Sequence, residues 1–272
     1  MNEKIAIIDT DSMLYSAFMP NKVADPNTGE PMKVDGKFVY TPKTDDEIKD
    51  TLDGIMFHIF NEGAFTHYIG FVKGNDTTDD RLLINPEYKA QRTKEIPEKW
   101  EITKQHAIEK WGIIEVNDIE VDDAVRITNI NIPNSHIVAI DKDLLWLEGE
   151  NFNWRKNEWN TVTKSQEEEY LSRSLIIGDT VDNIKGLVGK GEKYCDRHYI
   201  KKVHEVLPYY IIDYGLEKGV EEFYKNFKCL YILEKSDKFT NIPTPISIEK
   251  IIKNNESETN ESRSSSRKLP NS

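Results

Sequence analysis

Cysteine is scarce in this sequence, and long hydrophobic runs are absent. Cys195 and Cys229 are the only cysteines and do not form a metal-binding pair, which indicates a reduced setting. No apolar run approaches the ~20 residues that span a bilayer. The start, MNEKIAIIDTDS, carries acids at once, and its apolar run is four residues long, so we expect neither a signal nor a transit peptide. These absences predict a cytoplasmic protein with no membrane partner.

Positive charge is also in short supply, because the formal net charge is −12. Such a balance argues at first against a nucleic-acid partner, since phosphate binding favours positive charge. The average hides a strong segregation, however. Between residues 185 and 202 there are six Lys or Arg residues against two acids, a local excess of four. The overall charge therefore does not exclude DNA or RNA.

Short apolar runs alternate with helical patterns in the first part of the chain. The runs at 5–8, 67–72 and 136–140 are continuous, as in parallel strands buried on both faces. Residues 44–60 open with capping-box spacing and then place apolar residues on one face. Residues 97–111 have Pro97 near the start of a second amphipathic helix. This alternation predicts an α/β domain with a parallel sheet.

Beyond about residue 165 the pattern changes, and helical segments predominate. We therefore predict an α/β domain at 1–164 and a smaller helical region at 165–252. Residues 253–272 are rich in Ser, Asn and Glu with almost no apolar side chains, so we expect a disordered tail there.

Acidic side chains recur where the predicted strands end. They are Asp9 and Asp11 after the first strand, Glu120, Asp122 and Asp123 at a strand-to-helix junction, and Asp141 and Asp143 after the third strand. In an open parallel sheet the carboxyl ends of the strands share one edge, where ligands bind. Asp9 and Asp141 should therefore be neighbours in the fold, although 132 positions separate them in sequence.

Clustered carboxylates repel one another unless a positive charge lies among them. Oxygen ligands alone select a hard cation such as Mg²⁺ or Mn²⁺, and two such ions could hold a phosphodiester at both its attacked and its leaving oxygen. For any single aspartate, a helix cap or a turn is the commoner role. Recurrence at successive strand ends favours the metal interpretation.

The segment GDTVDNIKGLVGKGEK, at 178–193, adds Asp179 and Asp182, whose spacing of one helical turn would project both to one side. The residues that follow are suited to a phosphate: Gly186, Gly189, Lys190, Gly191 and Lys193. Glycines permit a turn with outward N–H groups, and lysines add charge, so we expect contacts to the nucleic-acid backbone without base reading. A P-loop is excluded, because Glu192 and Lys193 occupy the places of its Lys and Ser/Thr.

Five segments taken in order resemble the 5′-nuclease family of flap endonucleases and 5′–3′ exonucleases. They are IIDTDSMLYSAF, PEYKAQR, EVDDAV, AIDKDLLWL and GDTVDNIKGLVGKGEK, and they span roughly residues 4–200. The likeness is greatest to stand-alone phage enzymes and to the 5′-nuclease domain of bacterial DNA polymerase I. It implies a PIN-like parallel-sheet catalytic core and, in the helical region, a helix–three-turn–helix DNA-binding element.

The resemblance also implies roles for single residues. The metal-site carboxylates would be Asp9, Glu120, Asp122, Asp123, Asp141, Asp143, Asp179 and Asp182. Asp11 stands where the family more often has a small residue, so it is a possible ligand only. Lys89 and Arg92 would contact the scissile phosphate, where a cation stabilises charge that develops in the transition state. The glycine-rich turn would bind duplex backbone and a K⁺ ion.

The sequence departs from the family pattern at one place. The family has a further metal-binding aspartate at the end of its second strand, whereas this chain has Lys73 and Gly74 there. Asp76, Asp79 and Asp80 are the nearest acids that could substitute for it, and without a substitute the site lacks one ligand.

The resulting hypothesis is a Mg²⁺- or Mn²⁺-dependent 5′-nuclease acting near a 5′ end or flap of DNA, or on RNA primers in an RNA–DNA hybrid. For a phage-encoded enzyme the location would be the host cytoplasm. A PIN-like endoribonuclease shares the acids but does not need the glycine-rich turn. A DNA-binding protein with weak or no catalysis would account for the missing acid.

Overall fold

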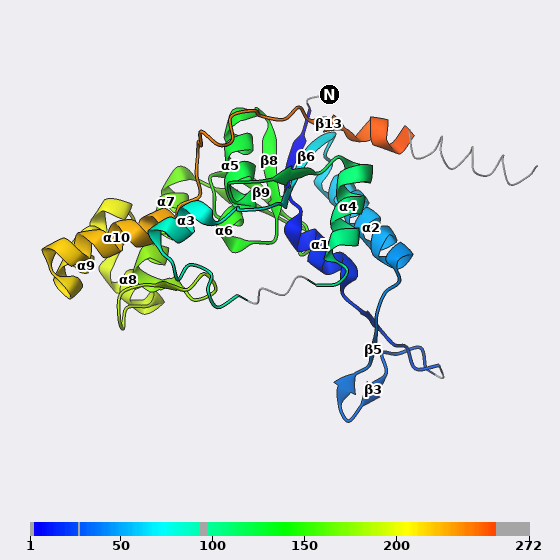
Figure 1. The fold of residues 1–272 in the computed structure, drawn as a ribbon, viewed down its shortest axis with the longest axis horizontal. Coiled ribbons are helices and arrows are strands. Elements are labelled where there is room, and N and C mark those ends of the chain that lie inside the picture. Colours follow the sequence, from blue (N-terminus) through cyan, green and yellow to red (C-terminus); the bar gives the residue numbers. More distant parts are fainter. Residues whose placement is uncertain (1–2, 27, 93–96, 254–272) are drawn as a thin grey trace, which may run out of the picture.

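A central sheet of mainly parallel strands organises the computed structural model, which describes residues 3–26, 28–92 and 97–253 (Figure 1). The strand order is β10-β9-β8-β1-β6-β13, and β7 also pairs with β6. The strands are β1 (Ile5–Asp9), β6 (His67–Lys73), β7 (Ile114–Val116), β8 (Ser135–Ala139), β9 (Gly149–Asn153), β10 (Glu158–Val162) and β13 (Ile246–Ser247). β10 and β13 run antiparallel to their neighbours, and the others are parallel. The predicted α/β class with a parallel-sheet core is confirmed.

The centre of the sheet consists of the three strands that the sequence predicts. β1 lies between β6 and β8, with Ile8 paired to Gly70 on one side and to Val138 on the other. All five residues of β1 are buried, which explains why its apolar run is continuous and does not alternate. The parallel register aligns the carboxyl ends of the three strands at one edge.

Helices cover both faces of the sheet. On one face α1 (Asp11–Phe18), α2 (Asp45–Gly63) and α4 (Trp100–Trp111) pack against alternate residues of β1, whereas α5 (Val121–Asn131) covers the other face. The predicted capping box begins α2, since the Thr44 N–H donates to Glu47 at 2.7 Å and the Glu47 N–H donates to the Thr44 hydroxyl at 3.3 Å. The helix predicted at 97–111 begins three residues later, at Trp100.

A helical region with its own apolar core adjoins the sheet (Figure 1). Its members are α7 (Lys164–Ile177), α8 (Glu192–His198), the 3₁₀ turn η1 (Val203–Glu205), α9 (Leu207–Tyr214) and α10 (Leu216–Leu230). After α10 the chain returns to the sheet, where Leu233 and Phe239 join the core beneath α5, and β13 pairs with β6. Residues 231–248 thus pack on the α/β core, although the predicted division places them with the helices.

Two β features are absent from the sequence-based description. The hairpin of β9 and β10 extends one edge of the sheet. A second ribbon projects between α1 and α2 (Figure 1) and contains β2 (Asn21–Lys22), β3 (Lys33–Val34), β4 (Lys37–Phe38) and β5 (Tyr40–Thr41). The strands of this ribbon are two residues long and almost wholly exposed, so they carry no apolar pattern. Of the predicted tail, residues 254–272 lie outside the described residues.

Among the helices that the structure describes, none combines the length and the apolar character needed to cross a membrane.

Candidate active site

Asp9 and Asp141 lie at the same edge of the sheet because of the parallel pairing of β1 with β8. Asp9 is the last residue of β1 and is 6% exposed. Asp141 follows β8 and caps α6 (Lys142–Leu145), where its Oδ1 accepts the N–H of Asp143 at 2.8 Å. The fold therefore brings together the two aspartates that lie 132 positions apart in the sequence.

Asp122 joins this pair from the first turn of α5, and the three carboxyl groups repel one another. Burial raises the pKa of Asp9 well above its ordinary value, and the charges of Asp11 and Asp141 raise it further. Burial likewise raises the pKa of Asp122, with added repulsion from Asp141 and Asp9. Asp141 is the exposed member of the group, yet loss of solvation by the surrounding protein also raises its pKa. We name Asp9, Asp122 and Asp141 the acidic centre.

Glu120, in contrast, is compensated by cations. Its carboxylate lies 2.6 Å from Nζ of Lys89 and 3.1 Å from a guanidinium nitrogen of Arg81, and it accepts the hydroxyl of Tyr88 at 3.2 Å. Burial acts to raise the pKa of Glu120, but Arg81 and Lys89 outweigh it, and the pKa is lowered. Glu120 remains ionised beside the acidic centre, held by a buried network.

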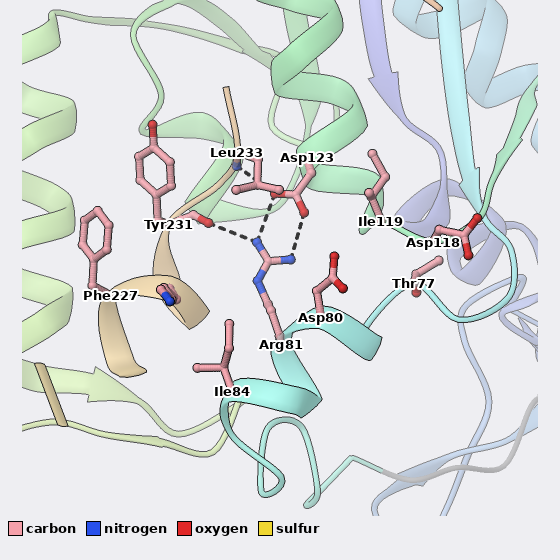
Figure 2. Close-up of a pocket in the computed structure, with 11 residues that line it drawn as sticks. Thr77, Asp80, Arg81, Ile84, Asp118, Ile119, Asp123, Phe227, Tyr231 and Leu233 are labelled. Carbon is pink, nitrogen blue, oxygen red and sulfur yellow. Dashed lines mark hydrogen bonds and ion pairs between the residues drawn. The ribbon is translucent and has the colours of Figure 1, made fainter. Parts of the chain in front are cut away.

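Asp123 faces a different part of the molecule, and Figure 2 shows its contacts. Both of its oxygens accept hydrogen bonds from Arg81, at 2.9 and 3.0 Å, and Oδ1 also accepts the N–H of Leu233 at 2.8 Å. These groups line a mainly apolar cavity of about 320 Å³ between α3 (Asp79–Ile84), α5 and the end of α10. The carboxylate of Asp123 thus joins the returning C-terminal chain to α5.

Asp179 and Asp182 lie in a turn and not on a helix. Oδ1 of Asp179 accepts the N–H groups of Val181 at 2.8 Å and Asp182 at 3.2 Å, so the side chain itself closes the turn. β11 (Gly178–Asp179) and β12 (Ile184–Lys185) flank it as a small ribbon. The helical spacing expected for the two aspartates is therefore wrong, because local side-chain bonds replace the helical ones.

The acids outside the acidic centre, Asp143, Asp179 and Asp182, each have a polar partner. Asp179 lies 3.2 Å from Nζ of Lys142, and Asp143 accepts the hydroxyl of Tyr170 at 2.5 Å. Asp182 accepts the Tyr88 hydroxyl at 3.1 Å and pairs with Arg92. These partners neutralise Asp179 and Asp182, and the uncompensated negative charge is left in the acidic centre.

Lys89 and Arg92 lie beside the acids, in the loop after α3. The backbone N–H of Lys89 donates to the carbonyl of Asp182 at 2.9 Å, which fastens this loop to the 179–182 turn. Lys89 is directed toward Glu120, with Asp182 3.9 Å from its Nζ. Arg92 is half exposed. Both cations could therefore face a phosphate placed over the acidic centre.

The donor set of the acidic centre is suited to a divalent cation. Its oxygen ligands are crowded, largely desolvated and without a cation among the three, so a bound ion would relieve their repulsion. Within residues 3–26, 28–92 and 97–253, however, no three acidic, histidine or cysteine side chains are arranged closely enough to hold a metal ion. Binding an ion would therefore require side-chain rotation.

The acids that follow β6 do not reach this centre. Asp76, Asp79 and Asp80 are exposed, and Asp80 pairs with Lys238 of the returning chain at 2.8 Å. Asp80 thus lies on the side of α3 that faces the C-terminal segment. None of them supplies the carboxylate that the sequence lacks at the end of this strand.

The glycine-rich turn joins β12 to α8 and is held by close backbone packing. A Cβ on Gly186 would lie 2.3 Å from the carbonyl oxygen of Ile176, so no other residue fits there without a shift. Gly189 and Gly191 have open space around them. Lys193 is exposed in the first turn of α8, whereas Lys190 pairs with Asp213. Lys193 is thus the more available of the two lysines for a phosphate.

Sequence reasoning missed several residues of the site. Arg81 joins Glu120 to Asp123, and Tyr88 joins Glu120 to Asp182. Lys142 and Tyr170 contact Asp179 and Asp143. Tyr88 and Lys142 are adjacent in sequence to predicted site residues, and this adjacency could have identified them. Arg81 has none, because its burial depends on α10 and the returning chain.

Solved structures share this arrangement of elements. One is T5 5′-exonuclease with bound divalent zinc ions, with a TM-score of 0.59, 14% identity, and coverage of 84% of this chain and 89% of that chain. Another is bacteriophage T5 D15 flap endonuclease, in a pseudo-enzyme–product complex with DNA and metal ions, with a TM-score of 0.57, 15% identity and the same coverages. The chain has a 5′-nuclease fold.

The solved structures thus confirm the fold that the five sequence segments predict. No protein-family model matches the sequence, and no curated protein matches it either. At 14–15% identity the likeness establishes the architecture, and the chemistry must be argued from the side chains.

Proposed function

We propose that this protein is a divalent-metal-dependent 5′-nuclease that hydrolyses phosphodiester bonds near a 5′ end or flap of DNA. The observation that carries the proposal is the acidic centre: three uncompensated carboxylates at the carboxyl edge of a parallel sheet, next to Lys89 and Arg92. The similarity of the fold to T5 5′-exonuclease structures, described with divalent metal ions and with DNA, supports it.

Each part of the site has a role in this proposal. Asp9, Asp122 and Asp141 would hold Mg²⁺ or Mn²⁺, with Glu120 adjacent and Asp143, Asp179 and Asp182 at the periphery. Bound divalent ions would lower the pKa of the attacking water and offset negative charge on the phosphate. Lys89 and Arg92 would orient the scissile phosphate and stabilise the charge that develops on its oxygens. The carboxylate of Asp123 already pairs with Arg81, so Asp123 would act mainly by holding α5 in position.

The glycine-rich turn and α8 would bind the duplex through its phosphates. Exposed Lys193 and the outward backbone at Gly189 and Gly191 suit contacts that do not read sequence. The predicted helix–three-turn–helix would consist of α7, the 178–191 loop and α8. Its DNA binding and its K⁺ ion are part of the proposal.

A cleavage assay tests the proposal. A duplex with a fluorescent 5′ flap is incubated with the protein in Mg²⁺, in Mn²⁺ and in EDTA. We expect cleavage only with metal, and a loss of about 100-fold or more in Asp141→Asn, because one charged ligand is removed. Asp50→Asn is the control, since Asp50 is exposed on α2, away from the site.

The same assay separates the other candidate functions. Cleavage undiminished in Asp141→Asn would reject the proposal. Cleavage of single-stranded RNA in preference to the flap would identify an endoribonuclease. Tight flap binding without cleavage by the unmutated protein would identify a DNA-binding protein. The ion pairs of Glu120, Asp179 and Asp182 would then explain the absence of cleavage, because these carboxylates already have cationic partners. A 5′ stretch of RNA in the flap tests primer removal.

A further inference from the structure

β6 is the central strand that brings no acid to the active-site edge. It lies between β1 and β7, and the chain after its last residue, Lys73, continues into Gly74. The structure shows why an acid cannot stand at position 74. A Cβ there would lie 2.3 Å from Oδ1 of Asn117 and 2.7 Å from the carbonyl oxygen of Val116, because β7 passes close beside the strand end.

The carboxyl group of Asp11, the first residue of α1, lies at this end of β6. Its Oδ1 accepts the backbone N–H of Lys73 at 2.9 Å, across 62 positions of sequence. The side chain reaches from the start of α1 to the carboxyl end of β6. In the described part of the chain, no hydrogen bond or ion pair engages its second oxygen, Oδ2.

Asp11 also lies next to the acidic centre. Its backbone N–H donates to Oδ1 of Asp9 at 3.2 Å, so the two carboxyl groups belong to one short turn. Burial raises the pKa of Asp11, and the positive charges of Lys73, Lys104 and Lys89 partly offset this rise.

We propose that Asp11 is a further ligand of the divalent ion, supplying at the end of β6 the carboxylate that the strand does not carry. The inference rests on the proposed function, because it concerns the ion held by Asp9, Asp122 and Asp141. One oxygen of Asp11 is fixed by the N–H of Lys73, and the other is free to coordinate. A carboxylate oriented in this way needs less ordering when the ion binds.

The competing role is purely structural, in which Asp11 serves only to satisfy the N–H of Lys73. Asp11→Asn separates the two roles, because asparagine keeps an oxygen that can accept this N–H and loses the negative charge. Asp11→Ala removes both. Asp76→Asn is the matched control, since Asp76 is an exposed acid near the same strand end.

The test measures Mn²⁺ binding to the full chain by titration calorimetry, and thermal unfolding in EDTA. We expect Asp11→Asn to bind Mn²⁺ about ten-fold or more weakly, the range found when oriented groups around a metal are removed, with no loss of thermal stability in EDTA, because the substitution also removes a charge that repels Asp9. Asp76→Asn should bind as the unmutated protein does. Equal Mn²⁺ affinity and stoichiometry in Asp11→Asn and the unmutated protein would overturn the inference.

Asp141→Asn, measured in parallel, keeps this inference separate from the proposed function. If Asp141→Asn loses Mn²⁺ binding and Asp11→Asn does not, the metal site stands and the role of Asp11 is rejected. If the unmutated protein binds no Mn²⁺ and cleaves no flap, the proposed function fails, and the role of Asp11 fails with it.

Discussion

Arg81 binds both carboxylate oxygens of Asp123, at 2.9 and 3.0 Å, and the pair is almost fully buried. The same guanidinium also donates to the carbonyl of Tyr231 at 3.1 Å. One ion pair thus connects α3, α5 and the chain that leaves α10. Since Asp123 also accepts the Leu233 N–H, its carboxylate has little capacity left for a metal ion.

Asp123→Asn should therefore destabilise the fold more than it weakens metal binding. Breaking one partner of a buried ion pair costs about 3–5 kcal/mol, and we expect the lower end of this range because Glu120 still pairs with Arg81. Urea unfolding measures the loss. The double variant Arg81→Met/Asp123→Leu should recover part of it, since both charges of the pair are then absent and Lys89 still compensates Glu120. A variant Asp123→Asn that is as stable as the unmutated protein but binds no Mn²⁺ would instead make Asp123 a ligand.

Lys89→Ala should lower turnover with little effect on DNA affinity. Nζ of Lys89 lies 2.6 Å from Glu120, next to the acidic centre, where a cation can stabilise charge that forms on the phosphate. Loss of one such group typically costs about 100-fold in kcat. Single-turnover cleavage and flap binding are measured together, with Lys37→Ala, exposed on β4, as control. An equal fall in cleavage and in flap binding would show that Lys89 contributes to DNA binding and not to the chemical step.

Asp9→Asn should stabilise the metal-free fold at neutral pH. The pKa of Asp9 is raised by burial and by the charges of Asp11 and Asp141, so its folded pKa exceeds its unfolded one. Such a group costs no stability below the unfolded pKa, and the cost grows as the pH rises from the unfolded pKa to the folded pKa, above which it is constant. Removing the charge should raise the Tm in EDTA by about 2–4 °C at pH 7, the shift for about 1 kcal/mol in a chain of this size.

The gain for Asp9→Asn should shrink toward pH 4, where the aspartate becomes protonated. Mn²⁺ at pH 7 should reverse the order, since the unmutated protein then gains stability from binding. Asp50→Asn should leave the Tm unchanged under all three conditions. A variant that is less stable than the unmutated protein at pH 7 in EDTA would show that Asp9 is already compensated.

Gly186→Ala should disrupt the glycine-rich turn, whereas Gly191→Ala should not. The added methyl group at 186 would lie 2.3 Å from the backbone oxygen of Ile176, and the neighbouring backbone cannot move aside cheaply. Overpacking of this kind costs about 1–3 kcal/mol. At Gly191 no atom lies within 4 Å of the added group, and the change should stay within about 0.5 kcal/mol.

Duplex binding by fluorescence anisotropy should fall in Gly186→Ala and persist in Gly191→Ala. Thermal unfolding of both variants shows whether the loss follows from the displaced loop. Equal duplex binding by the two variants would show that DNA binding does not depend on the geometry of this loop.

Much of the sheet could be predicted because its central strands are buried on both faces. A strand such as β1, buried at every residue, needs a continuous apolar run, and that run is visible in sequence. The projecting ribbon and the β9–β10 hairpin gave no such signal. Their exposed residues alternate weakly or not at all, and their pairing depends on neighbours.

The sequence could predict that acids meet at one edge of the sheet, but not which of them are compensated by cations. Parallel pairing was sufficient to bring Asp9 and Asp141 to one edge. Which acids remain uncompensated depends on cations from distant segments: Arg81 neutralises Asp123, and Lys142 neutralises Asp179. The turn at Asp179 was misjudged as helical, because side-chain bonds to the backbone compete with helix formation.

By itself the sequence determined the α/β order of elements, the acids at the strand ends and the glycine-rich turn, because these follow from local periodicity and residue type. The tertiary structure alone decided that Asp11 reaches the end of β6, that Asp123 serves an ion pair, and that Asp80 pairs with Lys238 of the returning chain. Such contacts join residues tens of positions apart. They are set by how strands and helices pack, which no local pattern records.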